Sequence, residues 1–135
     1  MAGIPLNTFK TVTFPSASNP TFDTSEKVVY VASTGITSIV LSAQVATVGN
    51  SASTVTFKHY RPGPLSTGPA VGSAPDTVHD TFTVILNNAT VPPNDALILL
   101  GGKLVLETFD YITLAAGDNT LNLNFVASIL ETANQ

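Results

Sequence analysis

The sequence feature that most constrains the fold is a two-residue alternation of apolar and polar side chains over residues 120–130. Its apolar positions are Leu121, Leu123, Phe125, Ala127 and Ile129, and its polar positions include Asn122, Asn124 and Ser128. Successive side chains of a β-strand point to opposite faces, so this alternation predicts a strand with one buried and one wetter face. We expect the apolar side to be core.

Further strand-like segments follow one another along the whole chain. Residues 54–60 and 81–86 also alternate, whereas residues 28–32 and 36–45 are more continuously apolar, as in strands that are central or covered on both sides. Shorter runs stand at residues 8–14, 97–100, 103–107 and 111–115. Turn-forming residues separate them. Repeated short strands predict an all-β chain, a single antiparallel β-sandwich that is jelly-roll-like, with seven to eight strands.

Composition excludes several classes of protein. The chain has 135 residues, which suits one domain, and only 10% of them are charged, with a formal net charge of −4. Its five basic residues are scattered, which argues against a nucleic-acid partner. It has no cysteine for disulfides or thiolate metal sites. No apolar stretch is long enough for a membrane span, and residues 1–10 do not resemble a signal peptide. We therefore expect a soluble protein that is made in the cytoplasm.

Two segments interrupt the series of strands. Residues 1–26 contain one short alternating run followed by a Pro- and Ser-rich stretch, with Phe9, Phe14 and Phe22 as apolar anchors. This segment is either an edge strand plus a loop of the same domain, or an arm that docks on a neighbouring subunit. Residues 61–76 form a Gly/Pro-rich loop within the sandwich domain, residues 27–135. Such a long loop is either a surface crossover or a contact loop, with Leu65 and Val71 as its apolar points.

Catalytic and metal-binding groupings are hard to assemble from this sequence. His59 and His79 both lie in strand-like segments, and Asp76 and Asp80 flank His79. Neighbouring strand residues point to opposite faces, so His79 and Asp80 would not chelate one ion together. Nucleophile-elbow and phosphate-loop motifs are missing from the sequence. We predict a non-enzymatic protein with no cofactor, no metal and no catalytic residue.

A resemblance to a known group covers most of the chain. Residues 91–131, VPPNDALILLGGKLVLETFDYITLAAGDNTLNLNFVASILE, resemble the C-terminal half of small β-sandwich virion structural proteins of tailed bacteriophages. The segments TFKTVTF and VVYVASTGITSIVLSAQVATVGNSASTVTFKHY are similar to the N-terminal half of the same group. One position departs from the pattern, because Phe109 stands where the group often has glycine. A phenylalanine does not adopt positive φ at low cost, so Phe109 is instead a candidate contact residue.

The resemblance implies structural work in a virion. It predicts a capsid cement or decoration protein that forms a homo-oligomer, preferably a homotrimer, and binds the major capsid protein. The candidate subunit contacts are Phe9, Phe14, Phe22, Leu65, Val71 and Phe109. A tail, neck or baseplate component is the first alternative. The second is a carbohydrate-binding β-sandwich for host attachment, for which Tyr30, Tyr60 and Tyr111 are the available aromatic platforms.

Overall fold

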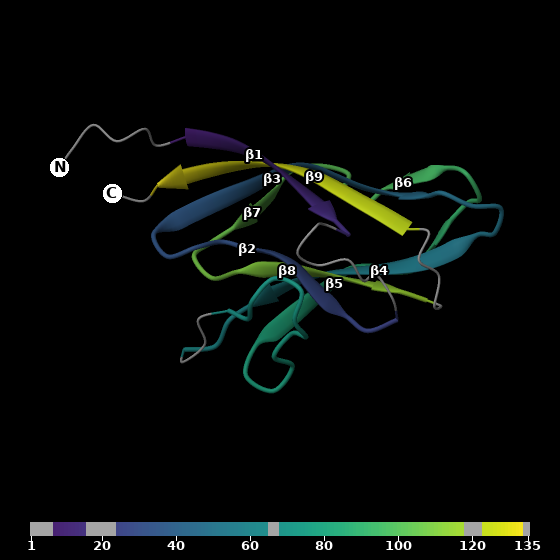
Figure 1. Ribbon diagram of the computed structural model, residues 1–135. Helices are drawn as coiled ribbons and strands as arrows, with labels where there is room; N and C mark the ends of the chain where they lie inside the picture. Colours follow the sequence, from purple (N-terminus) through teal and green to yellow (C-terminus); the bar gives the residue numbers. More distant parts are fainter. Residues whose placement is uncertain (1–6, 16–23, 65–67, 118–122, 134–135) are drawn as a thin grey trace.

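A computed structural model of the protein describes residues 7–15, 24–64, 68–117 and 123–133. Within these ranges the chain forms β-strands and no helix (Figure 1). The strands are β1 (Asn7–Phe14), β2 (Lys27–Val31), β3 (Ile36–Thr47), β4 (Ser53–Arg61), β5 (Thr81–Val91), β6 (Ala96–Ile98), β7 (Leu104–Leu106), β8 (Tyr111–Ala116) and β9 (Leu123–Ala133).

The strands form two antiparallel sheets that pack face to face, as the upper and lower layers of Figure 1 show. The five-stranded sheet has the order β1-β9-β3-β6, with β7 also paired to β3. The four-stranded sheet has the order β2-β8-β4-β5. If β6 and β7 are counted as one strand position, each sheet has four positions and the connections cross between the sheets as in a jelly roll. The predicted antiparallel β-sandwich is confirmed.

The structure has nine strands, rather than seven to eight, because one strand position is split. β6 pairs with residues 44–46 of β3, and β7 pairs in the same direction with residues 38–40. Gly101 and Gly102 lie in the interruption between them, where β3 itself has a bulge between Val40 and Ser42. The backbone amide of Leu99 donates to the Ala43 carbonyl, so the chain stays attached to β3 across the gap.

The core lies between the two sheets, and β9 supplies its inward face as predicted. Leu123, Phe125, Ala127 and Ile129 are all buried, whereas Leu121 lies outside the described residues. Phe125 faces Phe57 of the opposite sheet, with 6.4 Å between ring centroids. The alternation in the sequence therefore identified the correct inward face of this strand.

The N-terminal segment takes the edge-strand alternative over the part that is described. β1 pairs with β9 at every position from Asn7 to Phe14, and Phe14 stands opposite Phe125. This register turns Phe14 inward, and its side chain is buried in the core of its own chain. The prediction that Phe14 contacts a neighbouring subunit is wrong, because the alternation along β1 places it on the core side.

The Gly/Pro-rich loop covers the outer edge of the four-stranded sheet. The backbone amide of Val28 in β2 donates to the Ser73 carbonyl, and the amide of Gly72 donates to the Val28 carbonyl. Val28, Tyr60 and Tyr111 form a small buried cluster on this side of the molecule. The strand β2 is thus covered on both sides, although it is an edge strand and not a central one.

Candidate interaction surface

A row of apolar side chains crosses the outer face of the five-stranded sheet. The strand registers align Phe9 of β1 with Leu130 of β9, Leu130 with Ile39 of β3, and Ile39 with Val105 of β7. The two end residues are the most exposed, with Phe9 at 76% and Val105 at 52%. Neighbouring side chains on one sheet face lie close enough to act as one surface. We call these four residues the apolar row.

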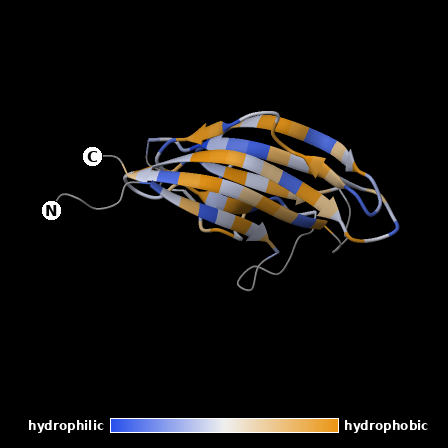
Figure 2. Cartoon of the chain, turned by 90° about the horizontal axis from the view of Figure 1, so that it is seen from above, coloured by the Kyte–Doolittle hydropathy of each residue, from blue (hydrophilic) through white to orange (hydrophobic). Residues whose placement is uncertain are grey.

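The other aligned strand positions of this face, within the described residues, are uncharged. Parallel to the apolar row, the registers align Thr13, Val126, Gln44 and Ile98, while Thr11, Ser128 and Ser42 lie between the two rows. A shallow groove follows the bulge of β3, lined by Ser42, Ala43, Gln44, Ile98, Val126, Ala127 and Ser128. Figure 2 looks onto this sheet, where hydrophobic segments of the strands alternate with hydrophilic ones. Because no aligned position here carries a charge, a partner could cover the face without desolvating an ion.

The structure separates the residues that the sequence proposed as subunit contacts. Phe9 belongs to the apolar row, whereas Val71 is exposed on the loop that covers β2, on the side of the other sheet. Phe109 is half-buried in the turn between β7 and β8, where its amide donates to the Ala32 carbonyl. Phe22 and Leu65 lie outside the described residues.

The structure shows which backbone conformation Phe109 adopts in the turn between β7 and β8. Its φ is +69°, so the phenylalanine adopts the left-handed conformation that glycine reaches at lower cost. The turn type, which the sequence left undecided, is therefore the one with positive φ at this position. Its amide hydrogen bond to Ala32 and the bond from the Asp110 amide to the Glu107 carbonyl hold the turn in place.

Sequence reasoning did not single out Leu130, Ile39, Val105 or Ile98. A signal for part of this set was present, since Val126 and Leu130 are apolar residues on the otherwise polar side of the alternation in β9. The alignment of these side chains with Phe9 depends on strand pairing between segments far apart in the chain, which periodicity does not specify.

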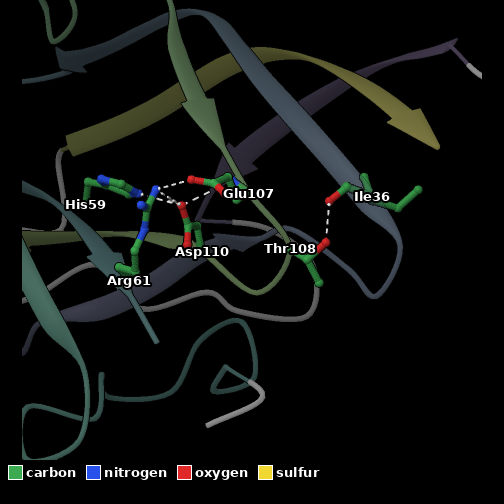
Figure 3. A network of polar contacts seen from close by, with 6 residues as sticks. All are labelled: Ile36, His59, Arg61, Glu107, Thr108 and Asp110. Carbon is green, nitrogen blue, oxygen red and sulfur yellow. Dashed lines mark hydrogen bonds and ion pairs between the residues drawn. The ribbon is translucent and has the colours of Figure 1, made fainter. Parts of the chain in front are cut away.

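A buried carboxylate organises the polar cluster in Figure 3. The Asp110 side chain is 2% exposed, and its Oδ2 accepts from His59 Nε2 at 3.1 Å, Arg61 Nη2 at 3.0 Å and the Glu107 amide at 3.1 Å. Arg61 also pairs with Glu107 at 2.7 Å. The Asp110 and Glu107 carboxylates raise the pKa of the Arg61 guanidinium. This cluster fastens the β7–β8 turn to the end of β4.

The second histidine belongs to a different contact. His79 Nδ1 lies 2.9 Å from Asp76 Oδ2, and Asp76 Oδ1 accepts from the backbone amides of Val78 and His79, which lowers the pKa of Asp76. Asp80 is buried and accepts from Tyr111 Oη at 2.6 Å. Each histidine thus pairs with its own carboxylate. The described residues contain no group of three or more acidic, histidine or cysteine side chains suited to holding a metal ion.

All three tyrosines are buried. Tyr60 stacks on Tyr111 at 4.8 Å between ring centroids, and Tyr30 Oη bonds to Ser38 Oγ at 2.7 Å and to the Glu131 carboxylate. Burial raises the pKa of each phenol well above its ordinary value, and the carboxylates of Glu131, Glu26 and Asp80 add to the shift. None of the tyrosines offers an exposed ring, so the carbohydrate-binding alternative has no tyrosine platform.

Comparison with known proteins yields little. No family model matches the chain, and no curated protein matches it. One matching solved structure is described under Bacillus endospore appendages that form disulfide-linked pili. It shares 12% sequence identity, with a TM-score of 0.44, over 98% of this chain and 93% of that chain. A likeness this distant does not indicate a shared function. In the described ranges there is no helix long and apolar enough to cross a membrane.

Proposed function

We propose that this protein is a non-enzymatic structural component of a bacteriophage virion, a cement or decoration protein that oligomerises and binds the major capsid shell. The observation that carries the proposal is the outer face of the five-stranded sheet, where the aligned strand positions are uncharged and include the apolar row from Phe9 to Val105. The family resemblance of the sequence supplies the virion setting.

The physical case rests on what such a face can bind. Protein interfaces are depleted of charged residues at their centre, and exposed apolar groups become favourable when a partner covers them. Phe9, Ile98 and Val105 are all more than half exposed in the isolated chain. Ser, Thr and Gln side chains between them can exchange water for hydrogen bonds to a partner without ionic desolvation. A capsid lattice would present such a partner surface many times over.

The number of copies in the oligomer and the place in the particle are finer predictions. The resemblance implies a trimer that binds the capsid shell, and a tail, neck or baseplate location is the alternative. A mass measurement on the purified protein gives the number of copies in the oligomer. Binding to undecorated heads, compared with binding to isolated tails, tests the place of the protein in the particle.

The direct test is co-sedimentation of the purified protein with undecorated phage heads. Val105→Lys places a charge on the apolar row, and we expect it to weaken head binding at least tenfold, about 1.4 kcal/mol. Val78→Lys is the matched control, because Val78 is 84% exposed on the loop between β4 and β5, away from the five-stranded sheet. Equal binding of Val105→Lys and wild type would contradict the proposed surface, and no binding by wild type would contradict the cement function.

A further inference from the structure

The four edges of the sandwich differ in how well they are protected against strand addition. Unpaired edge strands attract other strands, and proteins block them with loops, bulges, short strands or charges. The β2 edge is covered by the backbone of Gly72 and Ser73. β5 carries two register shifts, and Asn88 within it has a φ of +50°. β6 and β7 have three residues each.

In the part of the chain that the structure describes, the edge formed by residues 7–13 of β1 has neither a bulge, a break nor a covering loop. β1 pairs with β9 in one uninterrupted register over eight residues. Within the described ranges, residues 7–13 make no backbone hydrogen bond other than to β9. Lys10 is the one charged residue of β1, and its Nζ lies 3.6 Å from Glu131 Oε2, so its charge is directed back to its own sheet. This edge can accept another strand.

We propose that β1 pairs antiparallel with β1 of a second copy of this chain, about a two-fold axis at Phe9. The inference goes beyond the proposed function and departs from the trimer that the resemblance implies, because a two-fold pair gives a dimer; it rests on the proposed function only in assuming that the protein works by assembly. Closed two-fold contacts are the commonest kind between identical subunits. The pair would join the two five-stranded sheets into one continuous sheet.

The choice of a second copy and of this register follows from the side chains. An antiparallel self-pair that keeps both outer faces on one side must be centred on a single residue. Centred on Lys10, it sets two like charges directly opposite each other, which is unfavourable. Centred on Thr11, it sets Lys10 opposite Val12, which packs against the core. Centred on Phe9, it sets Phe9 opposite Phe9 and Lys10 opposite Thr8, and the apolar rows of the two copies become one.

The first experiment measures mass in solution by sedimentation equilibrium. We expect wild type to have twice the chain mass of 14.0 kDa and Phe9→Lys to be a monomer, because the two lysines at position 9 would then face each other directly across the axis. Val105→Lys is the control, since it changes the far end of the same row and should remain a dimer. If wild type is a monomer or a trimer, the proposed pair is overturned. If Val105→Lys loses the dimer as fully as Phe9→Lys does, the two copies pack through their outer sheet faces, and the edge pairing is overturned.

The second experiment tests the register by cross-linking. The natural sequence has no cysteine, so a single introduced thiol can only link to its copy. We expect Phe9→Cys to form a disulfide dimer under oxidising conditions and Thr11→Cys and Thr13→Cys not to, because only position 9 faces itself across the axis. A dimer cross-linked through Thr11→Cys alone would overturn the register. The cross-linking result and the co-sedimentation result are independent, because a monomer can still bind phage heads. Failure of the β1 pair is therefore distinguishable from failure of the proposed function.

Discussion

Truncation of Phe125 tests the assignment of the core. Phe125 lies in the middle of β9, is 2% exposed, and stands opposite Phe14 in β1 and Val45 in β3. Phe57 meets its ring from the other sheet. The change Phe125→Ala would therefore open a cavity with rigid walls on both sheets.

The expected magnitude follows from this packing. Buried Phe→Ala substitutions cost about 3–5 kcal/mol, depending on how far the surroundings can collapse. Here strand pairing holds the neighbouring backbones on both sides of β9, so we expect the upper part of that range. The free energy of unfolding of a domain of this kind is roughly 5–15 kcal/mol, so the loss would be a large fraction of the total.

The assay is urea-induced unfolding followed by circular dichroism, with the free energy of unfolding taken by linear extrapolation. Val126→Ala is the matched control, because the next residue of the same strand points outward and is half-buried, and we expect a loss of about 1 kcal/mol or less. A loss below about 1 kcal/mol for Phe125→Ala would refute the inward assignment of this face of β9.

Three further predictions concern the loop, the polar cluster and the tyrosines. Gly63→Ala should lower the free energy of unfolding by about 1–3 kcal/mol, because a Cβ there would lie 2.4 Å from the His79 carbonyl oxygen. Gly101→Ala has open space around the added Cβ and should leave the free energy of unfolding unchanged in the same urea-unfolding experiment. Asp110→Asn should lower the free energy of unfolding by about 1.5–3 kcal/mol, because it removes the negative charge that three hydrogen-bond donors share. A free energy of unfolding equal to that of wild type would contradict this role of Asp110. Burial raises the phenol pKa of Tyr111 above its ordinary 10.0, so above pH 10 the unfolded state releases a proton that the folded state keeps, and stability falls as pH rises. Tyr111→Phe should reduce the slope of stability against pH in that range, and an unchanged slope would show that Tyr111 does not contribute.

The sequence specified the local structure well where periodicity determines it. The alternation through Phe125 identified both the strand and its inward face, and the turn residues marked the boundaries between strands. Turn-forming residues were expected between residues 97–100 and 103–107, but the position of Gly101 and Gly102 opposite the bulge in β3 depends on the strand pairing. The split of one strand position into β6 and β7 could therefore not be read from the chain.

The candidate surface was less predictable, for the same physical reason. Phe9 and Phe14 look alike in the sequence, yet a strand places them on opposite faces, one exposed and one in the core. Tyr60 was a candidate platform in the sequence, but its ring is buried against Tyr111 and Phe82. Which residues meet across strands depends on long-range register, and which faces are covered depends on loops whose path no periodicity encodes.

The copy number of this protein in purified phage particles, measured by quantitative mass spectrometry relative to the major capsid protein, tests the central claim most directly. A cement or decoration protein repeats with the capsid lattice, so we predict a fixed stoichiometric ratio close to that of the shell subunits. A copy number far below that of the major capsid protein would contradict the decoration role and favour the tail, neck or baseplate. Absence from the particle would contradict the virion assignment altogether.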